Sequence, residues 1–232
     1  IKAGATTIIA ETSAPPDLSA ELTWIEVVDS EVVLGLAADA FYAYPSSQMK
    51  VLATTGTNGK TTITWILHHI LKTCGYEPGL VGTVEQRFGN IRRNTIFTTP
   101  PSADLHSLLG EMRDYGCTHA AIEASSHGMA MNRLAGVKVA VAGFSNLSRD
   151  HLDYHGTMEA YAEAKLGLLE LPGLHSVVLN YNDEASIAWA KKAKKSIQKV
   201  WTAVLPEPAR DMPEGRYCFA TNVQYHPNGC QF

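Results

Sequence analysis

The stretch TTGTNGKTT at residues 54–62 has the composition of a phosphate-binding loop. Glycines let backbone N–H groups converge on an anion, Lys60 adds a full positive charge, and the Thr61 hydroxyl suits Mg²⁺. The usual pattern G-x-x-x-x-G-K-[ST] would place its first glycine where this chain has Thr54, and Gly56 follows instead. Because an apolar run precedes the stretch and helical periodicity follows it, we predict a nucleotide-phosphate site, with a structural turn as the alternative.

Two other polar stretches follow apolar runs that we predict to be strands. Glu123 ends the apolar residues 120–122, where a carboxylate can hold Mg²⁺ directly or through water. The alternative is that Glu123 caps the next helix. Residues 146–155 place His151 and His155 four apart, but the surrounding aspartates and Gly156 indicate a loop, which argues against a two-histidine zinc site. Two interpretations of residues 146–155 stay open: a single histidine that contributes to a Mg²⁺ site, and a hydrogen-bonded turn with no ligand.

Lys165 lies among small and apolar residues on the helix that we predict after this loop. Such a lysine is ordinarily a surface residue whose stem lies along the helix, and the sequence pattern by itself favours that interpretation. A solvated face is also predicted for a second group, Lys191, Lys192, Lys194 and Lys195.

The elements that position these groups follow from the pattern after residue 48. Strand and helix alternate there, which predicts an α/β fold with a mostly parallel sheet covered by helices on both faces. Ligands bind such a sheet beyond the carboxyl ends of its strands. The predicted strands are residues 51–53, 80–82, 118–123, 137–144, 177–179 and, more weakly, 217–223. The predicted helices are residues 61–75, 102–116, 157–169 and 183–199.

Residues 1–47 and 48–232 are predicted to be separate domains. The first contains two short strands, at 6–10 and 24–28, and a helix at 31–42 that Asp29 and Ser30 cap. The polar, proline-marked break at 45–48 is the predicted boundary between this partial α/β domain and the nucleotide-binding domain. Because the chain begins at Ile1 without methionine, we expect a piece of a longer protein.

Composition argues against several kinds of partner. A net charge of −4 and a pI near 6.1 give no reason to expect nucleic acid or an anionic membrane. No apolar run approaches the roughly 18 residues of a membrane span. The four cysteines, at 74, 117, 218 and 230, lack C-x-x-C spacing, so we predict free thiols in a reducing cytoplasm.

Four motifs together give the chain a family resemblance. TTGTNGKTT, the TTP at 98–100, EASSHGM at 123–129 and NLSRDHLDYHGTMEAYAEAK at 146–165 resemble the Mur ligases, most closely the MurE type. The resemblance covers roughly residues 1–205. It implies a cytoplasmic, monomeric ligase that uses ATP and Mg²⁺ to add the third amino acid to the UDP-N-acetylmuramoyl dipeptide in peptidoglycan synthesis. It also implies a fragment that lacks the front of the first domain and the C-terminal domain, and is inactive alone.

The resemblance also implies roles for individual residues. Thr61 and Glu123 match ligands of one Mg²⁺, and His151 matches a ligand of a second Mg²⁺. Lys165 matches a position that is carbamylated in the family, and because a carbamate is an anion able to coordinate Mg²⁺, this replaces the surface interpretation. The expected catalytic residues are Lys60, Glu123, His151 and Lys165. The residues that match positions binding the ATP phosphates are Gly56, Thr57, Asn58, Gly59, Lys60, Thr61 and Thr62.

Substrate contacts are implied in the same way. The positions that match contacts to the UDP-muramoyl peptide are Thr98, Thr99, Ser125 and Arg133. Met131 stands where some members have glutamine and Phe97 where some have a polar residue, which leaves the substrate pose open.

The implied reaction starts with attack by the dipeptide carboxylate on the γ-phosphate of ATP, which gives an acyl phosphate and ADP. The amine of the incoming amino acid then attacks the acyl phosphate, and phosphate is released. A cyanophycin-synthetase-like or folylpolyglutamate-synthase-like ligase is the nearest alternative, and RDHLDYHGTMEAY argues against it. A nucleotide-dependent switch is the non-enzyme alternative. GTP-binding switches usually carry N-K-x-D, and NYND at 180–183 lacks the lysine.

Overall fold

A nine-stranded sheet forms the centre of the computed structural model, which describes residues 4–204, 212–221, 223–226 and 229–231. Its strand order is β11-β10-β9-β8-β3-β7-β4-β5-β6. Neighbours from β11 to β4 pair in parallel, whereas β5 and β6 are antiparallel, so the predicted mostly parallel α/β sheet is confirmed. The strands are β3 (Lys50–Thr55), β4 (Pro78–Val81), β5 (Glu85–Phe88), β6 (Ile91–Asn94), β7 (His119–Glu123), β8 (Val141–Phe144), β9 (Ser176–Asn180), β10 (Gln198–Val204) and β11 (Arg216–Ala220).

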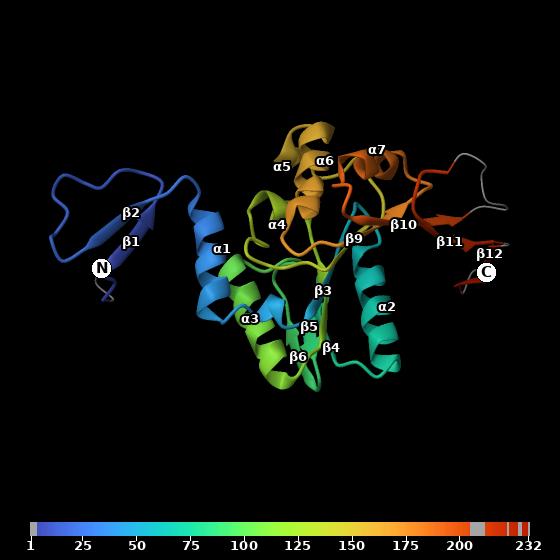
Figure 1. Ribbon diagram of the computed structural model, residues 1–232, viewed down its shortest axis with the longest axis horizontal. Helices are drawn as coiled ribbons and strands as arrows, with labels where there is room; N and C mark the ends of the chain where they lie inside the picture. The colour runs from blue at the N-terminus through green and yellow to red at the C-terminus, as the bar shows by residue number, and fades with distance from the viewer. Residues whose placement is uncertain (1–3, 205–211, 222, 227–228, 232) are drawn as a thin grey trace.

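Helices cover both faces of this sheet. In Figure 1, α2 lies on one side of β3 and β4, and α3 lies on the other. Leucines at 105 and 109 of α3 pack with Val51 and Ile122 of the central strands in a fully buried core. The helices are α2 (Lys60–Thr73), α3 (Ser102–Tyr115), α4 (Ser126–Ala130), α5 (Leu152–His155), α6 (Met158–Leu166) and α7 (Glu184–Lys192), with short 3-10 helices η1 (Pro45–Ser47) and η2 (Gly167–Glu170).

The N-terminal part stands beside this body. The predicted strands are confirmed as β1 (Thr7–Ala10) and β2 (Thr23–Glu26), which pair in parallel, apart from the large sheet (Figure 1). The predicted helix is α1 (Ser30–Phe41), capped by Asp29, and it packs against α3. The domain boundary near residue 47 stays a prediction. At the other end, β12 (Gln224–His226) and β13 (Gly229–Gln231) form a short antiparallel pair.

Several predicted elements had the wrong extent. The strand predicted at 137–144 begins at Val141, because Val137 and Val139 are buried in the preceding loop rather than in the sheet. The helix predicted at 183–199 ends at Lys192, and Lys199 belongs to β10. The helix predicted to continue to 169 changes to η2 at Gly167. The weak strand ends at Ala220, and the polar hairpin β5–β6 was not predicted.

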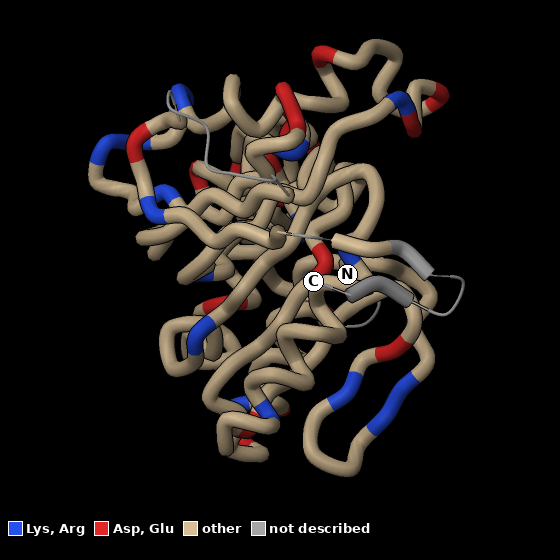
Figure 2. Tube along the Cα trace, turned by 90° about the vertical axis from the view of Figure 1, so that its right-hand side faces the viewer, with Lys and Arg blue, Asp and Glu red and all other residues tan. Residues whose placement is uncertain are grey.

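Charged residues are spread over the surface. In Figure 2 the Lys and Arg segments alternate with Asp and Glu segments instead of forming one continuous band. The lysines of the α7 end are exposed as predicted, and Lys192 and Lys194 pair with Glu163 and Glu170. Within the described ranges, no helix has the length and apolar character needed to cross a membrane. Cysteines 74, 117 and 218 are free thiols, and the side chain of Cys230 lies outside the described part.

Candidate active site

The predicted phosphate loop connects β3 to α2. Thr54 still belongs to the buried strand, where its carbonyl accepts the Ala124 N–H at 2.8 Å, and this explains the absent first glycine. Gly56 begins the turn with φ of 144°, and a Cβ there would overlap the Ser145 hydroxyl. The loop ends at Gly59, after which α2 starts with Lys60 and presents its N-terminal N–H groups. The strand, loop and helix are thus arranged as anion binding requires.

Two lysines converge on this loop. Lys60 Nζ donates to the carbonyls of Gly56 and Thr57 at 2.8 and 3.0 Å, and Lys165 Nζ donates to the same Gly56 carbonyl at 2.9 Å. Lys165 is 1% exposed and lies over the Tyr161 ring, so the surface position favoured by the sequence pattern is wrong. Burial, with a smaller contribution from the nearby Lys60 charge, lowers the pKa of Lys165 to about 7. Much of this amine is therefore neutral and nucleophilic near neutral pH.

Glu123 is a fully buried carboxylate at the end of β7. Its Oε2 accepts from the hydroxyls of Thr61 and Thr83 at 2.9 and 3.1 Å, and its Oε1 accepts from the Thr83 N–H at 2.9 Å. The capping alternative is wrong, because Ser125 caps α4 through the Gly128 N–H. Glu123 and Thr61 thus place hard oxygen ligands beside the phosphate loop, the kind of site that suits Mg²⁺ held partly by phosphates.

A second wall carries the residues matched to substrate contacts. Thr99 Oγ1 donates to the Glu123 carbonyl at 2.7 Å and lies 3.0 Å from Ser125 Oγ, and the Thr98 hydroxyl lies 3.0 Å from that of Thr83. Arg133 Nη1 donates to the Thr99 carbonyl at 2.8 Å. Hydrogen bonds thus link the Glu123 carboxylate through Thr83 to Thr98, and the next residue, Thr99, is bonded to Arg133.

Both sequence departures touch Arg133. Its guanidinium lies 4.7 Å over the Phe97 ring, and its Nη2 donates to Met131 Sδ at 3.2 Å. Phe97 and Met131 therefore both contact the guanidinium group and help to fix its position.

His151 is the residue before the short helix α5, where it has a left-handed φ of 52°; its side chain makes no capping hydrogen bond and is 44% exposed. Its ring packs edge-on against His127 at 4.8 Å, and His127 packs on Tyr154 at 4.2 Å. The His155 ring belongs to the same cluster, with its centroid 4.8 Å from that of Tyr154, 5.2 Å from that of Tyr161 and 5.5 Å from that of His127. Among the described residues, no three His, Cys, Asp or Glu side chains gather as a metal cluster. Asp150 Oδ2 lies 3.6 Å from His151 Nε2, and a negative group added to Lys165 would give a second cation a further oxygen ligand there.

One cavity of about 610 Å³ brings most of the predicted residues together. Thr99 and Gly56 lie behind its lining instead. Sequence reasoning missed Thr83 and His127, although Thr83 follows a predicted strand directly and so met the criterion applied to Glu123. The lining includes Thr57, Asn58, Gly59, Lys60, Thr61, Thr62, Thr83, Thr98, Glu123, Ser125, His127, Arg133, His151 and Lys165.

A second cavity of about 760 Å³ borders the other side of the loop at Asn58 and Gly59. Its walls combine apolar groups of α2 and β8, among them Ile63 and Phe144, with the amide side chains of Asn146 and Asn180. Flat, largely apolar groups with polar edges, such as nucleotide bases, suit a lining of this kind.

Comparison with known proteins places this site in a family. Residues 54–232 match the family described as Mur ligase middle domain. UDP-N-acetylmuramoyl-L-alanyl-D-glutamate--2,6-diaminopimelate ligase of Phocaeicola vulgatus is 39% identical over 198 residues, which are 85% of this chain and 41% of that protein. The protein of that name from Xanthomonas oryzae pv. oryzae is 40% identical over 180 residues, 78% of this chain and 36% of that protein.

A solved structure of a ligase with that name superposes with a TM-score of 0.78 at 28% identity, over 97% of this chain and 44% of that one. This chain thus spans less than half the length of these relatives. The chain belongs to the Mur ligase family, and most of it is that family's middle domain.

Proposed function

We propose that this chain supplies the ATP-binding centre of a ligase that extends UDP-N-acetylmuramoyl-L-alanyl-D-glutamate by one amino acid. The observation that carries the proposal is the pairing of a phosphate loop with a buried carboxylate, Glu123, and a buried lysine, Lys165, around one cavity. A nucleotide switch does not need a wall of polar groups beside its phosphates. An acyl-transfer ligase does, because a second substrate must be aligned with the γ-phosphate.

Each group then has a task. Lys60 and the loop N–H groups hold the ATP phosphates, and Thr61 with Glu123 would hold Mg²⁺, which neutralises phosphate charge when bound. Thr98, Ser125 and Arg133 hold the UDP-muramoyl peptide so that its terminal carboxylate faces the γ-phosphorus, with Thr99 fixing Ser125 and Arg133 from behind. Positioning and charge neutralisation carry the catalysis, and no protein nucleophile is required.

Lys165 acts as a carbamate in this proposal. Its neutral amine adds to CO₂, a C–N bond forms and one proton is released, which leaves an anion at the end of the side chain. That anion and the His151 imidazole would complete a site for a second Mg²⁺. Three observations support the idea: the burial of Lys165, its pKa of about 7, and a carbonyl as its hydrogen-bond partner.

The proposal is tested by the acceptor requirement of the full-length protein. We expect ADP release to depend on UDP-N-acetylmuramoyl-L-alanyl-D-glutamate together with an amino acid. The names of the relatives make 2,6-diaminopimelate the first amino acid to supply. ATP turnover that responds to a folate and not to the muramoyl dipeptide would assign the site to a different ligase.

A further inference from the structure

Arg133 lies on a turn, residues 132–136, that helix α1 holds from outside the active site. The side chain of Arg133 faces the cavity, where Thr99 and Phe97 contact it. The backbone of the turn faces the other way, toward α1 and α3. The position of the arginine therefore depends on elements that do not themselves line the cavity.

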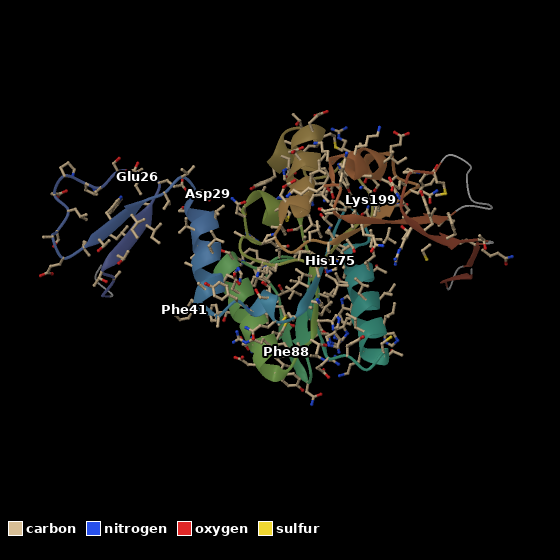
Figure 3. All side chains as sticks on the ribbon, in the orientation of Figure 1. Glu26, Asp29, Phe41, Phe88, His175 and Lys199 are labelled. Atoms are coloured by element: carbon tan, nitrogen blue, oxygen red, sulfur yellow. The ribbon has the colours of Figure 1, made fainter. Side chains whose placement is uncertain are left out.

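The first contact joins Asp29 to Asn132. Asp29 is the N-cap of α1, and its Oδ1 accepts the Val32 N–H at 2.9 Å. Its second oxygen, Oδ2, accepts from the Asn132 side-chain amide at 2.9 Å. Asn132 has a left-handed φ of 52°, a conformation that asparagine tolerates better than most residues. Figure 3 labels Asp29 at the start of α1 and Phe41 at its other end.

Two further contacts hold Ala135. Gly35 of α1 packs so closely that a Cβ at that position would lie 2.7 Å from the Ala135 carbonyl oxygen. From the α3 side, the fully buried His106 places Nε2 2.8 Å from that same oxygen, and its Nδ1 lies 3.4 Å from Oδ1 of Asp39 on α1. The turn thus lies between α1 and α3, and both helices contact it.

We infer that Asn132 is a positioning residue for Arg133. Helix α1 holds Asn132 through Asp29 and so fixes the turn that carries Arg133. The geometry couples the N-terminal part, which continues directly from β2 into α1, to the substrate side of the active site. This inference rests on the proposed function, because it takes Arg133 to contact the UDP-muramoyl peptide. Asn132 itself touches no reacting group.

The test is a substitution in the full-length protein that removes the contact and spares the backbone. Asn132→Gly keeps a residue that accepts positive φ and deletes the amide. We expect the KM and the Kd for the UDP-muramoyl dipeptide to rise about fivefold, the loss of one hydrogen bond, with kcat and the KM for ATP unchanged. Asp29→Ser, which can still cap α1, should give the same increase, and the double variant should add little more.

The matched control is Arg113→Met. Arg113 Nη1 donates to the Tyr42 carbonyl at 2.6 Å, so it also joins α3 to the end of α1, and its hydrogen bonds go to Tyr42, Ala43 and Asp114 rather than to the turn. We expect it to lower the melting temperature and leave the KM for the dipeptide unchanged. An equal increase in KM for Arg113→Met, or none for Asn132→Gly, would overturn the inference while leaving the acceptor requirement of the enzyme intact.

Hydrogen exchange gives a readout that needs no substrate. The N–H groups of Arg133 and Ala135 are bonded to the carbonyls of Gly128 and Asn132. In Asn132→Gly we expect these two amides to exchange faster by about the same fivefold factor, while that of Tyr44 keeps its rate. Unchanged protection of the turn would show that α1 does not hold it, whatever the substrate proves to be.

Discussion

A buried lysine without a carboxylate partner is costly, and Lys165 is such a residue. Its Nζ bonds to the Gly56 carbonyl and faces the Tyr161 ring, which together solvate an ammonium less well than water does. The cost explains why burial lowers its pKa from 10.5 to about 7. A protein that kept this lysine only for stability would gain by exchanging it for an apolar residue.

The first prediction follows from that cost. Between the folded pKa of about 7 and the unfolded value of 10.5, the unfolded chain binds the proton and the folded chain does not. The penalty is therefore complete below pH 7 and fades as pH rises toward 10.5. In CO₂-free buffer, Lys165→Met should raise the melting temperature by roughly 5 °C or more at pH 6 and by less than half of that at pH 9.

Calorimetry at the two pH values measures this difference, with Lys191→Met as the control, because Lys191 is an exposed lysine of α7. A gain of equal size at both pH values, or a loss at pH 6, would mean that Lys165 is not held as a poorly solvated amine.

The catalytic counterpart concerns the anion that we propose on the same side chain. In the full-length protein Lys165→Ala should lower ligase turnover by about a hundredfold or more, because the proposed second Mg²⁺, which would neutralise developing phosphate charge, would lose a ligand. Acetate or another short carboxylic acid should restore part of it by filling the space with a carboxylate. Lys191→Ala serves as the control. Full activity of Lys165→Ala without added acid would contradict the carbamate proposal.

At the scale of single residues, the sequence predicted many of the side chains that line one cavity, but not the burial of Lys165. Lys60, Thr61 and Glu123 follow from pattern alone, because a strand end and a glycine loop fix where they point. The burial of Lys165 depends on Gly56, which lies 109 positions away, and nothing in its own helix reveals that contact. The family resemblance pointed to this residue where its local pattern did not.

The phosphate loop carries a prediction at the scale of an element. Gly56 has a φ that disfavours side chains, its missing Cβ makes room for Ser145, and its carbonyl holds both lysines. Gly56→Ala should reorganise the loop and weaken binding of a non-hydrolysable ATP analogue by at least about tenfold. Isothermal calorimetry measures the affinity.

Gly75→Ala is the matched control for this substitution. Gly75 also has positive φ, 83°, but a Cβ there meets nothing within 4 Å. It should lower stability by about 1 kcal/mol and leave the affinity for the ATP analogue unchanged. Equal losses of affinity in both variants would mean that backbone strain in general, and not the shape of this loop, determines binding.

Elements were predicted where one physical signal dominated. The strands β3, β7 and β9 are short apolar runs, and α2 and α3 carry leucine or isoleucine at helical spacing. The hairpin β5–β6 escaped because its strands, EQRF and IRRN, are mostly polar. The predicted start of β8 was too early, because Val137 and Val139 are apolar residues that are buried in the loop before the strand. Hydrophobicity reports burial first and strand geometry only second.

For the molecule as a whole, the important fact is that the chain spans 41% of its Phocaeicola relative. The arrangement of strand, loop and helix, the buried Glu123 and the buried Lys165 are complete within it. Stability, binding of an ATP analogue and hydrogen exchange test these groups directly, and ligase assays test them together with the acceptor substrates.

The central claim is that this site joins two substrates through an acyl phosphate. The most direct test supplies the full-length protein with ATP, 2,6-diaminopimelate and muramoyl dipeptide whose terminal carboxylate carries ¹⁸O on both oxygens. Attack of that carboxylate on the γ-phosphorus followed by amine attack at the carbonyl carbon transfers one label to phosphate and leaves one in the new amide. We predict that mass spectrometry finds one ¹⁸O in each released phosphate. Phosphate that carries no label, or that takes its oxygen from water, would contradict the account.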